Sequence, residues 1–231
     1  MTVCSYEIQS NALKGLPYID EIRELTESQE NVLDQLGEML VRHSLEDQFC
    51  ISRLHYHFNV KADEIVVEGK AEDEGGGNLG VVRVEARSDL RENVVAVSWR
   101  ISQHEGTLVP IQFAISSEER NHTEKLRGVL PAIRKLLEKS GELCTFGLSY
   151  TGGDTFIDGK VLVEHTDTKE RIQWFEEQSV DEAGNFIQTN WTFEKRAHGA
   201  TSSRNMARVC RVVCKSTSEF VHIDRHKKER K

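Results

Sequence analysis

The sequence predicts an α+β fold in which a curved, mainly antiparallel sheet of about eight to ten strands is packed by two longer helices, at 26–44 and 118–140. Two stretches carry apolar residues at helical spacing, and many short alternating stretches lie between polar or glycine-containing breaks. The length of 231 residues is close to the upper limit of one hydrophobic core. We therefore expect a single α+β domain over 25–223, an irregular N-terminal arm over 1–24 and a basic C-terminal tail over 224–231.

The first helix is predicted at 26–44, where Thr26 and Gln29 form a capping box that satisfies free backbone N–H groups at the helix start. Apolar residues then recur along one face, which is typical of a helix packed against a sheet; they are Val32, Leu33, Leu36, Met39 and Leu40. The second helix, 118–140, keeps the same spacing on both sides of Pro131. Either this helix kinks at the proline, or Pro131 lies in the first turn of a separate helix.

Alternating apolar residues predict the strands. Two runs lie within 49–69, and further strands are expected at 79–86, 94–101, 108–115, 145–149, 160–165, 170–178, 186–193 and 208–215. The acidic, glycine-rich stretch 72–78 is predicted to be a surface loop, because glycine at this density disfavours regular structure.

The stretch 49–69 also carries the only His-x-His of the chain. Read as one strand, it directs Leu54 and Tyr56 to the core and places His55 and His57 together on the opposite face. Residues i and i+2 of a strand lie about 7 Å apart, so both imidazoles can converge on one ion.

Glutamate and histidine residues on other predicted strands supply candidate further ligands. Glu64 begins the run that follows the His-x-His, and Glu164 and His165 close a later strand. Because neighbouring residues of a strand point to opposite faces, only one of Glu164 and His165 can join the site. The candidate metal ligands are therefore His55, His57, Glu64 and His165. A divalent metal is the candidate cofactor, and the sequence leaves the cofactor otherwise unknown.

Two other interpretations of the histidine pair stay open. His55 and His57 can act as catalytic acid and base groups without a metal, because imidazole titrates near neutral pH. Alternatively, both side chains are hydrogen-bonded or solvated on a half-exposed strand face and have no chemical role.

The stretch HYHFNVKADEIVVEG resembles the first motif of cupins, in which His-x-His precedes a glutamate and a later glycine. The spacing departs from that motif, because six residues separate His57 from Glu64 and no glycine precedes His55 at the expected distance. A downstream Pro-Gly-His motif is also missing from the sequence. The chain is therefore not assigned to that family.

A second set of metal-capable residues lies near the C-terminus, where Cys210-x3-Cys214 precedes His222-x3-His226. These are the ligand types of a structural zinc site, but the spacing between the pairs is shorter than in zinc fingers. The favoured interpretation is a strand with buried cysteines, since free cysteine behaves as a small apolar residue.

Composition limits the partners and the compartment. A net charge of −8 argues against nucleic-acid binding, which depends on a cationic surface. No apolar run reaches the roughly 20 residues of a membrane helix, and the N-terminus lacks a secretory pattern. Five scattered cysteines are read as free thiols in a reducing compartment, so a cytoplasmic location is expected.

The sequence thus predicts a small-molecule-binding protein whose sheet encloses a pocket with His55 and His57 at its polar end; whether it is an enzyme stays open. The alternative is a non-catalytic accessory or protein-interaction domain. In that case the acidic loop 72–74 or the basic tail contacts a partner. Homo-oligomer formation is compatible with both hypotheses.

Overall fold

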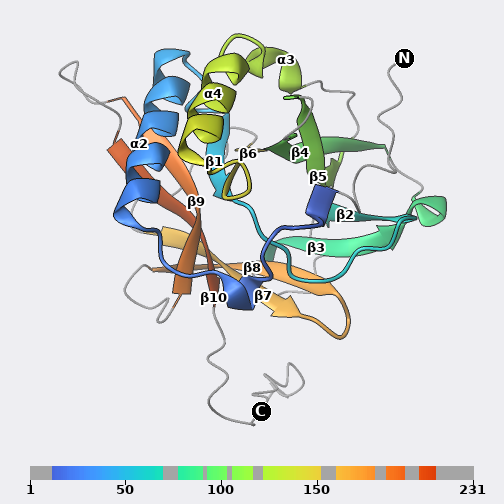
Figure 1. Ribbon diagram of the computed structural model, residues 1–231. Helices are drawn as coiled ribbons and strands as arrows, with labels where there is room; N and C mark the ends of the chain where they lie inside the picture. Colours follow the sequence, from blue (N-terminus) through green and yellow to red (C-terminus); the bar gives the residue numbers. More distant parts are fainter. Residues whose placement is uncertain are drawn as a thin grey trace.

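The computed structural model describes residues 12–69, 78–90, 93–102, 106–116, 122–151, 160–179, 186–195 and 203–211. Within these residues, ten strands close into a barrel, and the helices lie against one side of its wall (Figure 1). The predicted α+β class with a curved, mainly antiparallel sheet is confirmed. The acidic loop 72–74, Cys214, His222, His226 and the tail 224–231 lie outside the described residues.

The strand order around the barrel is β1-β6-β4-β5-β2-β3-β8-β7-β10-β9, and β9 pairs with β1 to close the ring. Neighbouring strands are antiparallel except for β2 with β5 and β7 with β10. The strands are β1 Phe49–Arg53, β2 Glu64–Gly69, β3 Asn78–Ala86, β4 Val94–Ile101, β5 Leu108–Ile115, β6 Phe146–Tyr150, β7 Lys160–Asp167, β8 Ile172–Ser179, β9 Phe186–Glu194 and β10 Ser203–Arg211.

The helices are α2 Glu27–Arg42, α3 Thr123–Leu126 and α4 Leu130–Ser140, with short 3-10 turns at Ile19–Glu21 and Arg87–Asp89. The predicted capping box is present at the start of α2, where the Gln29 backbone N–H donates to Thr26 Oγ1 over 3.3 Å. None of the helices in the described part of the chain is long and apolar enough to cross a lipid bilayer.

The predicted second helix is two helices, and Pro131 explains the division. The chain leaves α3 after Leu126 and resumes helical structure at Leu130, so Pro131 lies in the first turn of α4. A proline there removes no helical hydrogen bond, because the first N–H groups of a helix have no partner within the helix. Gly141 ends α4 at a φ of 77°, as expected for a left-handed C-terminal residue.

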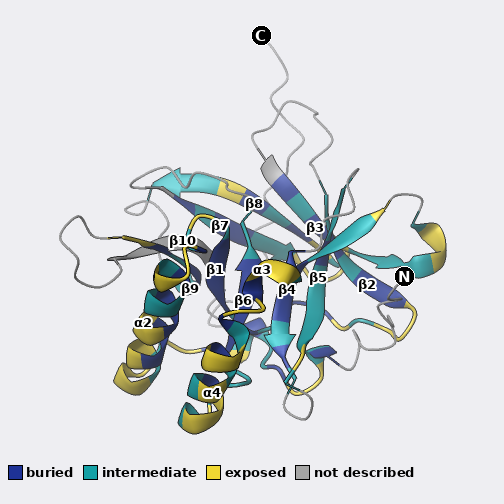
Figure 2. Cartoon of the chain, turned by 90° about the horizontal axis from the view of Figure 1, so that it is seen from above, coloured by how far each residue is buried: buried dark blue, intermediate teal, exposed yellow. Residues whose placement is uncertain are grey.

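The largest apolar core lies outside the barrel, between its wall and helices α2 and α4 (Figure 2). Alternate residues of three adjacent strands face these helices and are fully buried; they are Phe49, Ile51, Phe146, Leu148, Trp191 and Phe193. Because side chains of a strand alternate between faces, the intervening residues point into the barrel. Several of these are polar, namely Ser52, Ser149 and Asn190, so the barrel interior is partly polar.

Candidate metal centre in the barrel interior

The segment that carries both histidines follows β1 rather than extending it. The strand ends at Arg53, which pairs with Phe146 at the start of β6, and no further β6 residue is left to pair with the chain. The single strand expected through His55 and His57 is therefore shorter than predicted. The next residue, Leu54, is buried at 1% exposure and still donates its N–H to the Thr145 carbonyl over 2.8 Å. The chain then bends at His57 and Phe58.

The N-terminal arm fixes the backbone between the two histidines. The Tyr56 N–H donates to the Pro17 carbonyl over 3.1 Å, and the Tyr56 carbonyl accepts from the Ile19 N–H over 3.1 Å. The rings of Tyr18 and Tyr56 meet edge to face at 5.3 Å. The described part of the arm, which was predicted to be irregular, thus holds Tyr56 in place and orients the flanking imidazoles.

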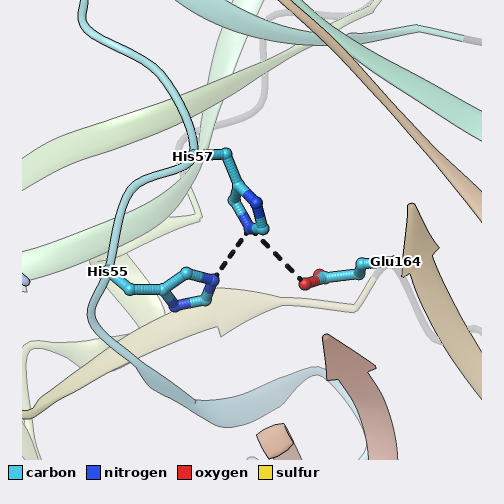
Figure 3. Close-up of side chains that lie close together, drawn as sticks. All are labelled: His55, His57 and Glu164. Carbon is cyan, nitrogen blue, oxygen red and sulfur yellow. Dashed lines mark hydrogen bonds and ion pairs between the residues drawn. The ribbon is translucent and has the colours of Figure 1, made fainter. Parts of the chain in front are cut away.

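His55, His57 and Glu164 meet inside the barrel (Figure 3). The two Nε2 atoms of the histidines are 3.0 Å apart, and His57 Nε2 lies 3.8 Å from Glu164 Oε2. Glu164 comes from β7, more than a hundred residues further along the chain. One ligand atom from each of the three residues lies within 4.8 Å of the others, so the group could hold a metal ion.

Hydrogen bonds on the far side of each ring set its orientation. His55 Nδ1 lies 2.8 Å from the Arg53 carbonyl, which only accepts, so Nδ1 carries the hydrogen and Nε2 keeps its lone pair. On the far side of the His57 ring, Nδ1 lies 2.8 Å from Thr166 Oγ1. On the near side, Gln173 Nε2 is 3.3 Å from His57 Nε2, the atom that also faces His55. The threonine hydroxyl can donate or accept, so it accommodates either tautomer of His57. Such outer hydrogen bonds are typical of metal-binding histidines.

Burial keeps both imidazoles neutral. Desolvation lowers the pKa of His55 to about 4, against an ordinary value of 6.5. Desolvation, with the charge of His55 as a second cause, lowers the pKa of His57 well below its usual value. Neutral imidazole is the form that ligates a metal, and Glu164, at 7% exposure, adds a carboxylate.

The three residues line a small cavity of about 90 Å³. Sites for drug-sized ligands have volumes of roughly 300–1,000 Å³, so this cavity suits an ion with a very small ligand or a few waters. Its other walls carry polar groups from several strands, including Ser98 and Ser149, whose hydroxyl oxygens are 2.7 Å apart.

Glu64 and His165, the other candidate ligands from the sequence, lie elsewhere. The Glu64 carboxylate accepts two hydrogen bonds from the Arg171 guanidinium, at 2.9 and 2.6 Å, and these bonds lower the Glu64 pKa to about 2. His165 stacks on Trp174 and lies 3.1 Å from Glu176 Oε2.

Strand alternation separates Glu164 from His165. The two residues are adjacent on β7, so one side chain enters the barrel and the other points away from it. The sequence indicates that only one of the pair can join the histidines, and the tertiary structure supplies Glu164. Thr166 and Gln173 carry no sequence signal of their own, because isolated polar residues on strands are common.

Comparison of the chain with protein families, with curated proteins and with solved structures gave no match. The case for a metal centre therefore depends on the geometry of the site. Two neutral imidazoles and one carboxylate form a ligand set that divalent transition ions accept, with open coordination positions left for water or a ligand.

Proposed function

We propose that this protein binds a divalent transition-metal ion through His55, His57 and Glu164, and that the ion acts on a very small ligand inside the barrel. The observation that carries this proposal is the convergence of three ligand atoms within 4.8 Å in a buried interior. The low pKa values of the histidines support it, since protons do not compete with a metal at neutral pH.

The spacing of the ligand atoms fits one ion. Two nitrogens that are each about 2.1 Å from a metal lie about 3.0–3.4 Å apart, for angles between octahedral and tetrahedral. The Nε2 atoms are 3.0 Å apart, and the Glu164 oxygen lies 3.8 Å from His57 Nε2, so the Glu164 side chain must shift to complete such a site.

A bound ion would supply Lewis acidity, polarising a carbonyl group or lowering the pKa of a coordinated water. The protein would supply orientation: Thr166 and the Arg53 carbonyl hold the imidazoles, and the cavity limits the size of the ligand. Ser98 and Ser149 offer hydroxyl groups that can hydrogen-bond to the ligand.

The test is metal stoichiometry and affinity. Protein stripped with a chelator is titrated calorimetrically with Zn²⁺, Mn²⁺, Co²⁺ and anaerobic Fe²⁺, and metal content is measured after desalting. We expect one equivalent in the wild type and its loss in His57→Ala and in Glu164→Gln. His165→Gln, next to Glu164 on the other face of β7, is the matched control and should keep wild-type binding. A double variant, His55→Ala with His57→Ala, that retained full metal content would overturn the proposal.

A second candidate function is acid–base chemistry by the histidine pair alone, favoured by the 3.0 Å contact between the two rings. One neutral ring donates to the other across this contact. If one ring accepts a proton from a ligand, the pair carries one positive charge and can share that proton between its two Nε2 atoms. Nitrogen-15 NMR of the imidazoles in metal-free protein tests this. A protein that binds none of the four ions, and whose rings share one hydrogen, would favour this candidate over the metal centre.

A further inference from the structure

A second cleft lies on the outer face of the barrel wall, beside the segment that leads into α2. Its volume is about 370 Å³, which is within the range of small-molecule sites, roughly 300–1,000 Å³. Apolar walls come from Leu25 and from Phe186, Ile187 and Trp191 of β9. The polar and charged lining residues are Glu24, Glu30, Arg53 and Gln188.

Strand register directs the Arg53 side chain into this cleft. Ile51 of β1 pairs with Trp191 of β9, and both belong to the core beneath the helices. Arg53 lies two residues after Ile51 and therefore faces the same side of the wall. The backbone carbonyl of Arg53 turns to the barrel interior, where it lies 2.8 Å from His55 Nδ1.

One buried nitrogen atom of the Arg53 guanidinium, Nη1, has no hydrogen-bond partner among the described residues. Nη1 also has almost no accessible surface. Burial lowers the pKa of the Arg53 guanidinium, and the charge of Glu142 offsets part of this effect without a hydrogen bond to Nη1. Buried cationic N–H groups are normally paired, because leaving one unsatisfied costs free energy. The acidic residues of the cleft, Glu24 and Glu30, are exposed at its edge, where water screens their charge.

We infer that this cleft binds a small organic monocarboxylate with an apolar body. The carboxylate accepts hydrogen bonds from the Arg53 guanidinium, whose planar N–H groups match the two carboxylate oxygens. The apolar body packs against the half-buried side chains of Leu25, Phe186 and Ile187, which lose water-exposed surface. Glu24 and Glu30 at the edge disfavour multiply charged anions such as phosphate, because like charges repel.

The probe is octanoate, titrated into metal-free full-length protein by calorimetry and by tryptophan fluorescence. We expect octanoate to bind the wild type, and octanol and octylamine to bind at least tenfold more weakly. Trp191 lines the cleft, so Trp191→Phe should abolish the fluorescence change, whereas Trp174→Phe should keep it.

Arg53→Gln should weaken octanoate binding at least tenfold, and Arg53→Lys should recover part of the loss. Arg127→Gln, an exposed arginine beside α3, is the control and should bind like the wild type; thermal unfolding verifies that each variant folds. Equal affinity of Arg53→Gln and wild type would overturn the inference, as would equal binding of inorganic phosphate and octanoate. If octanoate bound to Glu30→Gln but not to the wild type, the inference would also be overturned. That result would mean that Glu30 pairs with the Arg53 guanidinium in the native chain.

The test is independent of the metal centre, because it uses metal-free protein and a ligand on the opposite face of the wall. If the protein binds octanoate but no metal, this inference stands and the proposed function is wrong. If it binds a metal but not octanoate, the proposed function stands and this inference is wrong.

Discussion

His57 is the residue at which the contacts of the barrel interior converge. Its Nδ1 atom meets Thr166, and its Nε2 atom faces His55, Gln173 and Glu164 within 3.8 Å. These partners come from three separate segments of the chain, so the ring holds a single orientation. The same burial that orients the ring also keeps it uncharged.

The histidine pair should make the stability depend on pH. Between pH 6.5 and about 4 the unfolded chain protonates at His55 whereas the folded chain does not, so the free energy of unfolding falls as pH falls through this window. The loss at His55 is up to about 3 kcal/mol. Urea denaturation at several pH values measures it, and His55→Asn should show a shallower slope.

The Glu64–Arg171 ion pair acts in a separate window and serves as an internal control. The Glu64 pKa is lowered to about 2 from 4.5, so its contribution is present above pH 4.5 and is lost as pH falls towards 2. If His55→Asn and wild type lose stability equally between pH 6.5 and 4, the assignment to His55 is wrong.

Thr166 should tune metal affinity without being a ligand. Thr166→Val keeps the shape of the side chain and removes the hydroxyl that orients His57. Loss of such an outer hydrogen bond typically costs roughly 10–100-fold in metal affinity. Calorimetry should therefore show one equivalent of metal bound at a Kd raised by this factor, and an unchanged Kd would contradict the role.

At the scale of the element, α2 shows how packing can override helix propensity. Gly37 lies in the middle of this helix and is buried against Phe193 of β9. A Cβ built on Gly37 would lie 2.1 Å from the Phe193 ring, whereas atoms in van der Waals contact are about 3.5–4.0 Å apart. Glycine is present because the helix lies this close to the sheet.

Gly37→Ala should therefore destabilise the protein. Propensity alone would give a gain of about 1 kcal/mol, but the added methyl group displaces a ring that is 2% exposed, and overpacking costs typically 1–3 kcal/mol. Chemical denaturation measures the difference, with Ser28→Ala in the exposed first turn of α2 as a near-neutral control. A more stable Gly37→Ala protein would show that α2 moves away from β9 at little cost.

The whole molecule separates an apolar core from a partly polar interior. Helices α2 and α4 cover the outer face of β1, β6 and β9 (Figure 2). The inner faces of these strands carry Ser52, Ser149 and Asn190. Stability comes chiefly from the outer core, because hydrophobic burial scales with the apolar area removed from water. The interior is thereby left available for polar groups and for the candidate metal site.

Metal binding should stabilise the whole fold. A ligand that binds only the folded chain adds about 2.7 kcal/mol at 100 times its Kd, which is roughly 5–10 °C in Tm for a chain of this length. Calorimetric scans with and without Zn²⁺ measure this shift, and Glu164→Gln should reduce it strongly. An equal shift in Glu164→Gln would mean that the ion binds elsewhere.

The sequence by itself determined the capped helix at Thr26, most of the strands, and the pairing of His55 with His57 in space. These depend on local periodicity and on short-range chemistry, which neighbouring residues contain. The sequence left two alternatives at Pro131, a kink or the first turn of a separate helix, and the structure has the second. Only the tertiary structure decided that the sheet closes into a barrel, that β1 ends before the histidines, and that Glu164 rather than Glu64 or His165 reaches them. Those outcomes depend on which strands become neighbours and which face turns inward, and this is set by pairing between residues far apart in the chain, such as Ile51 with Trp191.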